Sequence, residues 1–362
     1  MEYKDALSLY KDDVIQCADL SLPWEKLANS SICISGATGM IGSFLIDVIM
    51  NKNMHSRLNC KVIALGRNEA KALKRIPYFG NQLFSFVQCD INGQNVKIPK
   101  ADYMIHLAST THPLAYVEQP IETITANIFG LFNMLNSFVL NNQRKRFLLA
   151  SSVEIYGENN GEVDRFDEKY CGYIDCNDLR AGYPESKRLS ESICQGFISA
   201  YDADIVISRL PRVYGGNVQL DDTKAISQFL FNGAQKKDVI LKSNGEQKYS
   251  FGYVADVVSG LLYCLLKGNT GEAYNIASEN SDITLSELAS IIADYAKVNV
   301  VFSSPGEKES RGYSKATRAI MDGKKIASLG WTANTAIDIG VKKTLDMLSA
   351  RFQALSTSKE SQ

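Results

Sequence analysis

Short apolar runs that alternate with helix-like segments dominate residues 31–210, and they limit the folds available to the chain. The runs read 31-SICIS, 61-KVIAL, 83-LFSFVQ, 102-DYMIHLA, 146-RFLLAS and 204-DIVISRL. Between them lie amphipathic segments, the clearest at 39–51, 115–141 and 184–201. Strands joined by crossover helices form a parallel sheet with helices on both faces. The sequence therefore predicts an α/β fold with a doubly wound parallel sheet of the Rossmann type.

The alternation loosens after about residue 209, where a second and smaller α/β region begins. The expected parts are an N-terminal helical extension over 1–28, a dinucleotide-binding Rossmann domain over 29–208, a smaller substrate-binding domain over 209–350 that packs in part back onto the first, and a flexible tail over 351–362. The long helices expected at 115–141 and 184–201 offer a face for a homodimer.

Charge and cysteine content exclude several classes of function. Lys and Arg number 39 against 40 Asp and Glu, so no basic field favours nucleic acid or an anionic membrane. The 8 cysteines include no C-x-x-C pair, which favours free thiols in a reducing cytoplasm. The 3 histidines form no cluster with metal-ligand spacing, and His106 is most simply a core residue. We expect a cytoplasmic protein with no metal, no nucleic-acid partner and no membrane span.

Three glycines stand where the first expected strand meets the first expected helix, in 36-GATGMIG. Small residues at such a turn let the backbone approach a pyrophosphate, whose charge then lies at the helix N-terminus. Glycines also serve as plain turn punctuation, but the G-x-x-G-x-x-G spacing in this context predicts dinucleotide binding. The cofactor-binding residues expected in this turn are Gly36, Thr38, Gly39, Met40, Ile41 and Gly42.

The end of the second expected strand offers no carboxylate to the ribose 2′-hydroxyl of NAD, because it reads Leu65-Gly66-Arg67-Asn68. An arginine beside a glycine can accept a 2′-phosphate, so the sequence slightly favours NADP over NAD, unless Arg67 stacks on the adenine. After the third expected strand, Asp90 and Ile91 are expected beside the adenine. Asp90 could equally cap a turn.

Tyr183 and Lys187 in 183-YPESK are four residues apart, so both side chains project from one helical face. A lysine beside a phenol favours the phenolate, lowers its pKa and can also bind the nicotinamide ribose. This pair alone is common on ordinary amphipathic helices. Ser152 ends the fifth expected strand, however, and its hydroxyl would face the same crevice and polarise a substrate alcohol or carbonyl. Together the three residues predict acid/base chemistry at Tyr183.

The chain resembles the extended short-chain dehydrogenases of the NAD-dependent epimerase/dehydratase family over roughly residues 30–348. The resemblance lies in the glycine turn, 105-IHLAS, 125-TANIFGLFNML, 151-SSVEIYG, 183-YPESK, 250-SFGYVADV and 328-SLGW. Within this group the chain is most similar to UDP-glucuronate decarboxylases and nucleotide-sugar dehydratases, through 107-LASTTHPLAYVEQP and 170-YCGYIDCNDLRAGYPESKR. The resemblance implies a bound NAD(P), with further cofactor contacts from Leu107, Ala108, Ser109 and Asn127.

The resemblance also implies roles in catalysis. Tyr183 would be the base, Lys187 its partner and Ser152 the hydroxyl helper. Glu154 would match a carboxylate that decarboxylases and dehydratases use after the sugar is oxidised at C4. At a strand end, Glu154 could instead cap a turn or pair with a nearby cation.

Three departures from the family pattern affect the expected substrate site. The segment 247–251 reads QKYSF where relatives usually have Q-x-R-S-F, so a diphosphate contact is missing or moved to Lys248. The segment 304–307 reads SPGE in place of Arg-x-Gly-Asp, and Arg212 stands where many relatives have Asn. The substrate-binding candidates are Thr110, Arg180, Arg212, Lys248 and Arg311. A single cation among these is more often a solvated surface charge.

Three functions fit these features. The first is a nucleotide-sugar enzyme that uses bound NAD(P) to oxidise the sugar at C4, after which the keto sugar is epimerised, dehydrated or decarboxylated. The second is an NADPH-dependent ketoreductase of a nucleotide-linked sugar, which Gly66-Arg67 would suit. The third is a non-catalytic dinucleotide-binding protein, against which the intact Ser152, Tyr183 and Lys187 argue.

Overall fold

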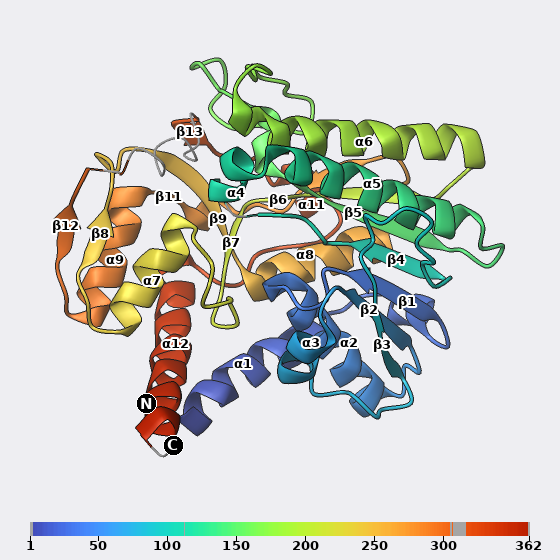
Figure 1. Cartoon of the computed structure of the whole chain (residues 1–362), viewed down its shortest axis with the longest axis horizontal. Helices are drawn as coiled ribbons and strands as arrows, with labels where there is room; N and C mark the ends of the chain where they lie inside the picture. The colour runs from blue at the N-terminus through green and yellow to red at the C-terminus, as the bar shows by residue number, and fades with distance from the viewer. Residues whose placement is uncertain (1–2, 112, 305, 307–315, 361–362) are drawn as a thin grey trace.

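A parallel sheet forms the larger part of the protein in the computed structural model, which describes residues 3–111, 113–304, 306 and 316–360 (Figure 1). Within these residues the sheet has seven strands: β1 (Ser31–Ser35), β2 (Lys61–Gly66), β3 (Phe84–Gln88), β4 (Tyr103–His106), β5 (Arg146–Ser152), β6 (Ile205–Leu210) and β10 (Ala273–Asn275). Each of the six apolar runs forms a strand, which confirms the predicted fold class.

The strand order fixes where a ligand crevice can open. The order is β10-β6-β5-β4-β1-β2-β3, so the direction of chain progression reverses between β1 and β4. In that pair Ser35 stands opposite His106. Ligands of open α/β sheets bind outside the carboxyl ends of the strands at such a switch point.

Helices cover both faces of the sheet (Figure 1). Helices α5 (Pro120–Val139) and α6 (Gly182–Tyr201) pack together on one face. Helices α2 (Met40–Ser56) and α8 (Val254–Lys267) pack on the other. The helix expected over 115–141 is divided at Gln119 into α4 (Pro113–Glu118) and α5, because Pro120 starts a new helix. Each face therefore carries its own hydrophobic cluster, and both long helices lie beside the carboxyl ends of β4 and β5.

The N-terminal extension forms α1 (Tyr3–Ala18), which packs against α2 and against the last helix, α12 (Ile337–Glu360). Helix α12 continues beyond residue 350, into the segment expected as a flexible tail. Tertiary contacts explain the longer helix. The Arg351 guanidinium donates to the Val218 carbonyl at 2.7 Å, and Phe352 packs edge-to-face on Phe231.

The smaller region gathers at the side of the sheet where β6 ends (Figure 1). Strands β7 (Arg212–Tyr214), β11 (Asp282–Thr284) and β13 (Arg318–Ala319) pair with β9 (Lys248–Tyr253), while β8 (Val239–Leu241) pairs with β12 (Val300–Phe302). The remaining elements are α3 (Glu69–Arg75), α7 (Ala225–Ala234), α9 (Leu285–Ala296), α11 (Lys324–Ala327), η1 (Trp24–Leu27), η2 (Val153–Tyr156), η3 (Leu179–Ala181) and η4 (Glu279–Ser281). Two later elements belong to the larger part instead: α8 packs on the large sheet, and β10 is one of its edge strands. In the described part of the chain, no helix combines the length and apolarity that a membrane span needs.

Candidate active site

The glycine turn lies directly against the loop that follows β4. Gly36 has a φ of +70°, and a Cβ placed on it would lie 2.8 Å from the backbone nitrogen of Ala108. A Cβ on Gly42 would collide with the carbonyl oxygen of Gly36. Helix α2 begins at Met40, with Gly39 as its N-cap. The glycines thus leave bare backbone at a helix N-terminus, and this surface fits the pyrophosphate of a dinucleotide.

The segment after β7 also reaches this turn. The Gln219 side chain donates to the Thr38 carbonyl, and the Asn217 side chain donates to the Met40 carbonyl, each at 2.9 Å. Ile41 is half-buried against the larger hydrophobic cluster. The smaller region is therefore joined by hydrogen bonds to the turn expected to hold the cofactor.

The ends of β2 and β3 place the residues expected near the adenosine. Arg67 is exposed, and its guanidinium has no partner among the described residues. Asp90 is also exposed, and its carboxylate accepts a hydrogen bond from the Asn92 backbone at 3.1 Å, which is the turn-capping geometry considered above. Ile91 is buried under Gly130 of α5. Arg67 thus remains available to a ligand, while Asp90 already has a structural role.

A chain of hydrogen bonds connects the loop after β4 to the start of α6. Ser109 Oγ donates to the Asn127 side-chain oxygen at 2.7 Å, and the Asn127 amide donates to Ser186 Oγ at 2.9 Å. Ser186 Oγ then donates to the Tyr183 carbonyl at 2.8 Å. Buried Asn127 therefore fixes the expected cofactor loop relative to the helix turn that carries Tyr183. Thr110 is half-buried next to this chain, and its carbonyl accepts from Ser109 Oγ at 3.4 Å.

Tyr183 is buried and its phenol is surrounded by hydroxyl groups. Burial raises the pKa of Tyr183, and the charge of Glu154 adds to the rise. Hydrogen bonds with Ser152, Tyr116 and Ser109 act in the opposite direction and lower this pKa. Ser152 Oγ also accepts from the Glu154 backbone at 3.2 Å, which fixes the hydroxyl at the start of η2. The structure thus brings Ser152 and Tyr183 together, as expected.

Lys187 is buried one turn after Tyr183 on α6. Its Nζ donates to the Ala150 carbonyl at 3.0 Å. Burial lowers the pKa of Lys187 to about 8. The Lys187 ammonium is thus hydrogen-bonded to the end of the strand that carries Ser152, and the hydroxyl groups around Tyr183 favour the ionised form of its phenol.

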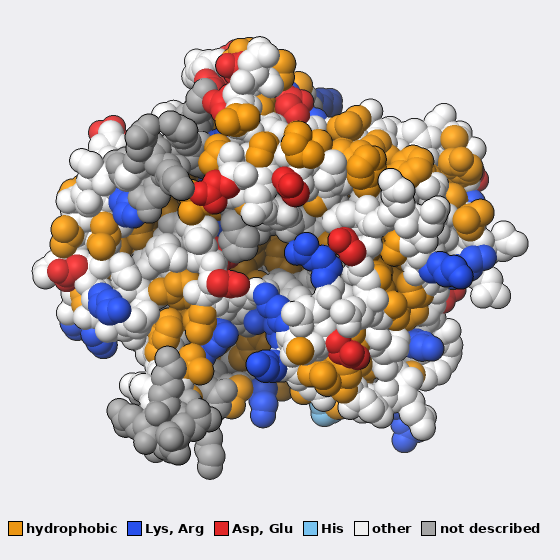
Figure 2. Space-filling view, viewed as in Figure 1, with side chains coloured by type: hydrophobic (Ala, Val, Ile, Leu, Met, Phe, Trp, Pro, Cys, Tyr) orange, Lys and Arg blue, Asp and Glu red, His pale blue; other side chains and the backbone are white. Residues whose placement is uncertain are grey.

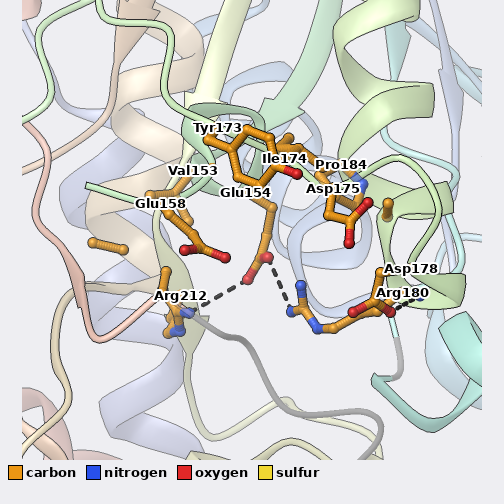
Figure 3. Close-up of a pocket in the computed structure, with 14 residues that line it drawn as sticks. Val153, Glu154, Glu158, Tyr173, Ile174, Asp175, Asp178, Arg180, Pro184 and Arg212 are labelled. Atoms are coloured by element: carbon orange, nitrogen blue, oxygen red, sulfur yellow. Dashed lines mark hydrogen bonds and ion pairs between the residues drawn. The ribbon is translucent and has the colours of Figure 1, made fainter. Parts of the chain in front are cut away.

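Glu154 forms ion pairs with two arginines in a pocket that Pro184, the residue after Tyr183, also lines (Figure 3). Its carboxylate oxygens lie 3.0 Å from an Arg180 nitrogen and 3.3 Å from an Arg212 nitrogen. Burial raises the pKa of Glu154, but the attraction of Arg180 and then Arg212 outweighs it, so the net pKa lies below the usual value. The Arg212 guanidinium also stacks on the Tyr249 ring at 3.5 Å. Glu154 is therefore paired with cations, which is the alternative considered above.

The outer wall of this pocket is acidic. Glu158, Asp175 and Asp178 line it together with the central ion pairs (Figure 3). The Asp175 carboxylate accepts from the Asn177 backbone at 3.1 Å, and that of Asp178 accepts from the Arg180 backbone at 2.9 Å. On the face shown in Figure 2, both Lys or Arg and Asp or Glu side chains stand around a hollow near the centre.

Other expected site residues lie elsewhere. Lys248 does not line this pocket, because it starts β9 on the side where its charge acts on Asp282 and Glu287. Arg311 lies outside the described residues. Burial lowers the pKa of His106 to about 3, and its Nδ1 lies 2.9 Å from Ser35 Oγ. His106 is therefore a neutral histidine in the core of the sheet.

Sequence reasoning missed three residues around the site. Tyr116 stacks on Tyr183, and Glu191 and Arg209 form a buried ion pair behind β5. Signals for two of them were present. Glu191 follows Lys187 by four residues on the same helical face, and Arg209 interrupts an apolar strand. Tyr116 carries no such signal, because nothing in a single sequence places α4 over α6.

Two curated relatives are similar over most of their length. UDP-glucuronic acid decarboxylase 3 of Arabidopsis thaliana is 28% identical over 287 residues, covering 78% of this chain and 80% of that protein. UDP-glucuronic acid decarboxylase 1 of Danio rerio is 26% identical over 326 residues, covering 89% and 73%.

Solved structures share the fold. UDP-glucose 4-epimerase of Thermotoga maritima, with UDP-glucose, superposes with a TM-score of 0.75 at 20% identity, covering 90% of this chain and 99% of that one. UDP-glucuronic acid 4-epimerase of Bacillus cereus, with UDP-glucuronic acid and NAD, gives 0.73 at 19%, covering 88% and 98%. The family model for the NAD dependent epimerase/dehydratase family matches residues 32–277, more than half of the 362 residues, and the chain therefore belongs to that family.

Proposed function

We propose that this nicotinamide-dependent nucleotide-sugar enzyme acts on a UDP-linked uronic acid, oxidises C4 and then releases the C6 carboxyl group as CO2. The observation that carries the proposal is the position of Glu154 between Arg180 and Arg212, in a pocket that is also lined by Ala181 and Pro184, on either side of Tyr183 in the sequence. The relatives named UDP-glucuronic acid decarboxylases support the same reaction.

In a pocket whose outer wall is acidic, the arginine cluster around Glu154 is the part that suits a carboxylated sugar. Two guanidinium groups face one carboxylate, so among these three residues one positive charge is in excess. Arg212 Nη1 is buried and has no hydrogen-bond partner among the described residues. A buried donor without a partner is unfavourable until a ligand satisfies it. A carboxylate on C6 of the sugar supplies both the charge and the acceptor.

The reaction that follows oxidation needs little further chemistry from the protein. A nicotinamide cofactor on the glycine turn supplies reversible oxidation of the sugar carbinol. Once C4 is a ketone, the C6 carboxylate is β to it, and loss of CO2 moves the C5–C6 bonding electrons onto the C4 oxygen as an enolate. The Ser152 and Tyr183 hydroxyls, hydrogen-bonded to each other, are placed to donate to that oxygen. Protonation at C5 then restores the ketone, and return of the hydride to C4 would give the pentose alcohol and leave the cofactor oxidised again.

Glu154 favours decarboxylation over dehydration. Loss of water requires an acid that protonates the departing hydroxyl group. Because Arg180 and Arg212 keep the pKa of Glu154 below its usual value, Glu154 is a carboxylate at neutral pH and a poor proton donor. Its role in the proposal is to hold the two guanidinium groups in place around the substrate carboxylate.

Product analysis tests the proposed reaction. The purified protein is incubated with UDP-glucuronic acid, UDP-glucose or dTDP-glucose, with NAD or NADP, and the products are weighed by mass spectrometry. We expect a UDP-pentose and CO2 from UDP-glucuronic acid only, without net change in the cofactor. A product of unchanged mass would support epimerisation instead, and a product that has lost water would support dehydration.

Arg212 offers a sharper test of the carboxylate site. Hydrogen bonds to charged groups contribute about 1.5–3 kcal/mol, so Arg212→Gln is expected to raise KM for UDP-glucuronic acid about 10–100-fold. Arg146→Gln is the matched control, because Arg146 forms a half-buried ion pair with Asp204 at the opposite end of β5. Equal KM values for Arg212→Gln and Arg146→Gln would remove Arg212 from the substrate site.

A second candidate function is reduction of a keto sugar by NADPH. Exposed, unpartnered Arg67 at the end of β2 supports it, because a 2′-phosphate would pair with the guanidinium. Stoichiometric loss of NADPH absorbance with a 4-keto nucleotide sugar, and no turnover of UDP-glucuronic acid, would favour this second function.

A further inference from the structure

Three consecutive residues at the end of β5 are each bound by a different turn of α6. Lys187 Nζ donates to the Ala150 carbonyl at 3.0 Å, and Ser151 Oγ donates to Glu191 Oε1 at 2.5 Å. Ser152 is hydrogen-bonded to Tyr183. The strand end that carries Ser152 is therefore fixed to the helix that carries Tyr183 and Lys187.

Glu191 contributes more than its bond to Ser151. Arg209 Nη2 lies 2.7 Å from Glu191 Oε2, and Arg209 Nε lies 3.1 Å from Oε1, so the pair is bidentate. The Glu191 side chain is only 13% exposed and the Arg209 side chain only 10%. Ser151 and Arg209 stand opposite each other in the β5–β6 register. One buried carboxylate thus joins the carboxyl ends of two neighbouring strands to α6.

Arg209 extends this network to the segment that carries Glu154. Its Nη1 donates to the Tyr156 hydroxyl at 2.9 Å and to the Glu168 carbonyl at 2.8 Å. Tyr156 is the last residue of η2, and its hydroxyl donates to Asn275 on β10 at 2.6 Å. Displacement of Glu191 would therefore be felt at Ser152 and along η2.

Glu191 is also the main charge that acts on Lys187. The titratable groups facing Lys187 are Tyr183, Glu191 and Cys194 on α6 and His106 on β4. Burial lowers the pKa of Lys187 to about 8, and Glu191 gives the largest opposing effect. Arg209 is not among the groups that shift this pKa.

We propose that Glu191 is a positioning residue: it fixes the strand end that carries Ser152 to α6, and it is the anionic partner of buried Lys187, one turn away on the same face of α6. The proposal rests on the proposed function only where it assigns Ser152, Tyr183 and Lys187 to the reaction. Such buried ionic networks hold geometry by satisfying every polar group at once.

Titration of Lys187 tests the charge without any substrate. In protein carrying 13C-labelled lysine, the Lys187 signal is assigned by its absence from Lys187→Arg, and its midpoint is followed by NMR. A depressed lysine pKa means that charge is lost as pH rises through about 8 in the wild type. In Glu191→Gln we expect the Lys187 midpoint at lower pH, because the Lys187 ammonium no longer has the Glu191 carboxylate as its partner. Glu185→Gln, on the same helix and paired with Arg188, is the matched control and should leave the midpoint unchanged.

Kinetics with UDP-glucuronic acid test the consequence. The alkaline fall of kcat should move to lower pH in Glu191→Gln, together with the NMR midpoint. Glu191→Asp keeps the charge but shortens the reach, so it should keep the wild-type pH profile while kcat falls about 10–100-fold from misplacement of Ser152. A residue with a merely structural role would lower stability in all variants and move neither the midpoint nor the alkaline limb.

If Glu191→Gln fails to fold, the double variant Glu191→Gln/Arg209→Gln is used instead, because it also removes the buried guanidinium that loses its partner with Glu191. In this double variant we also expect the titration midpoint of Lys187 to lie at lower pH than in the wild type. An unchanged Lys187 midpoint in the variants that fold would overturn the proposal. Absence of turnover with every nucleotide sugar would instead contradict the proposed function, while the NMR result would still decide the role of Glu191.

Discussion

The rings of Tyr116 and Tyr183 are stacked, with 4.4 Å between their centroids and 11° between their planes. Tyr116 comes from the short helix α4 and is buried, so the two phenols lie side by side away from water. Burial raises the pKa of Tyr183, while the hydrogen bond from Tyr116 lowers it. Tyr116 therefore acts on the pKa of Tyr183 in two ways. Its stacked ring helps to bury the Tyr183 phenol, which raises this pKa, and its hydroxyl donates a hydrogen bond, which lowers it.

Tyr116→Phe separates these effects. The stack remains, but a group that lowers the pKa of Tyr183 is lost, so this pKa should rise further. Because the proposed base works in its deprotonated form, the increase of kcat/KM with pH should move to higher pH. Tyr170→Phe is the control, since Tyr170 is stacked on Phe166 at 4.8 Å, away from Tyr183. An acid limb at the same pH in both variants would show that the Tyr116 hydroxyl does not act on the base.

Tyr183→Phe tests the base itself. Only the ionisable hydroxyl is removed, so folding and cofactor affinity should change little, while kcat should fall about 10²–10⁴-fold or more. Cofactor binding is followed by quenching of protein fluorescence, and folding by thermal unfolding. Near-normal turnover in this variant would exclude Tyr183 as the acid/base group.

The fold follows closely from local patterns in the sequence. Each apolar run became a strand because the side chains of a parallel sheet are buried on both faces, which requires uninterrupted apolar residues. The glycine turn was equally predictable, since Gly36 adopts a positive φ that other residues rarely tolerate. The extension of α12 beyond residue 350 was not predictable, because it depends on contacts of Arg351 and Phe352 with distant segments.

The candidate site was only partly predictable. The sequence predicts Ser152, Glu154 and Tyr183 as site residues because each lies in a short motif at the end of a strand or the start of a helix. The partners of Glu154 are separate in sequence, and Arg180 and Arg212 meet only because η3 and β7 converge on η2. The orientation of Lys187 towards the Ala150 carbonyl depends on tertiary packing, which a four-residue spacing does not specify.

The preference for NADP or NAD is expected to depend on Arg67. Its exposed guanidinium at the end of β2 is expected to favour NADP, so Arg67→Asp should shift the preference towards NAD, because a carboxylate repels a 2′-phosphate and accepts hydrogen bonds from a free hydroxyl. Both cofactors are titrated against both proteins. Lys61→Asp, an exposed cation at the start of the same strand, controls for the change in net charge. A wild-type preference for NAD would contradict the assigned role of Arg67.

Glu154 separates the chemistry that follows oxidation from plain hydride transfer. Glu154→Gln keeps the size and hydrogen-bonding capacity of the side chain but removes the charge that holds Arg180 and Arg212. The freed guanidinium groups should then bind the substrate carboxylate more tightly and disfavour its departure. We therefore expect oxidation of the sugar to survive, seen as reduced-nicotinamide absorbance, while CO2 release slows sharply.

Glu158→Gln is the matched control, because Glu158 lines the same pocket without an ion pair to either arginine. A ketoreductase would tolerate both changes, since reduction requires only Ser152, Tyr183, Lys187 and the cofactor. Loss of oxidation together with CO2 release would instead assign Glu154 a structural role in holding η2 and the hydroxyl of Ser152.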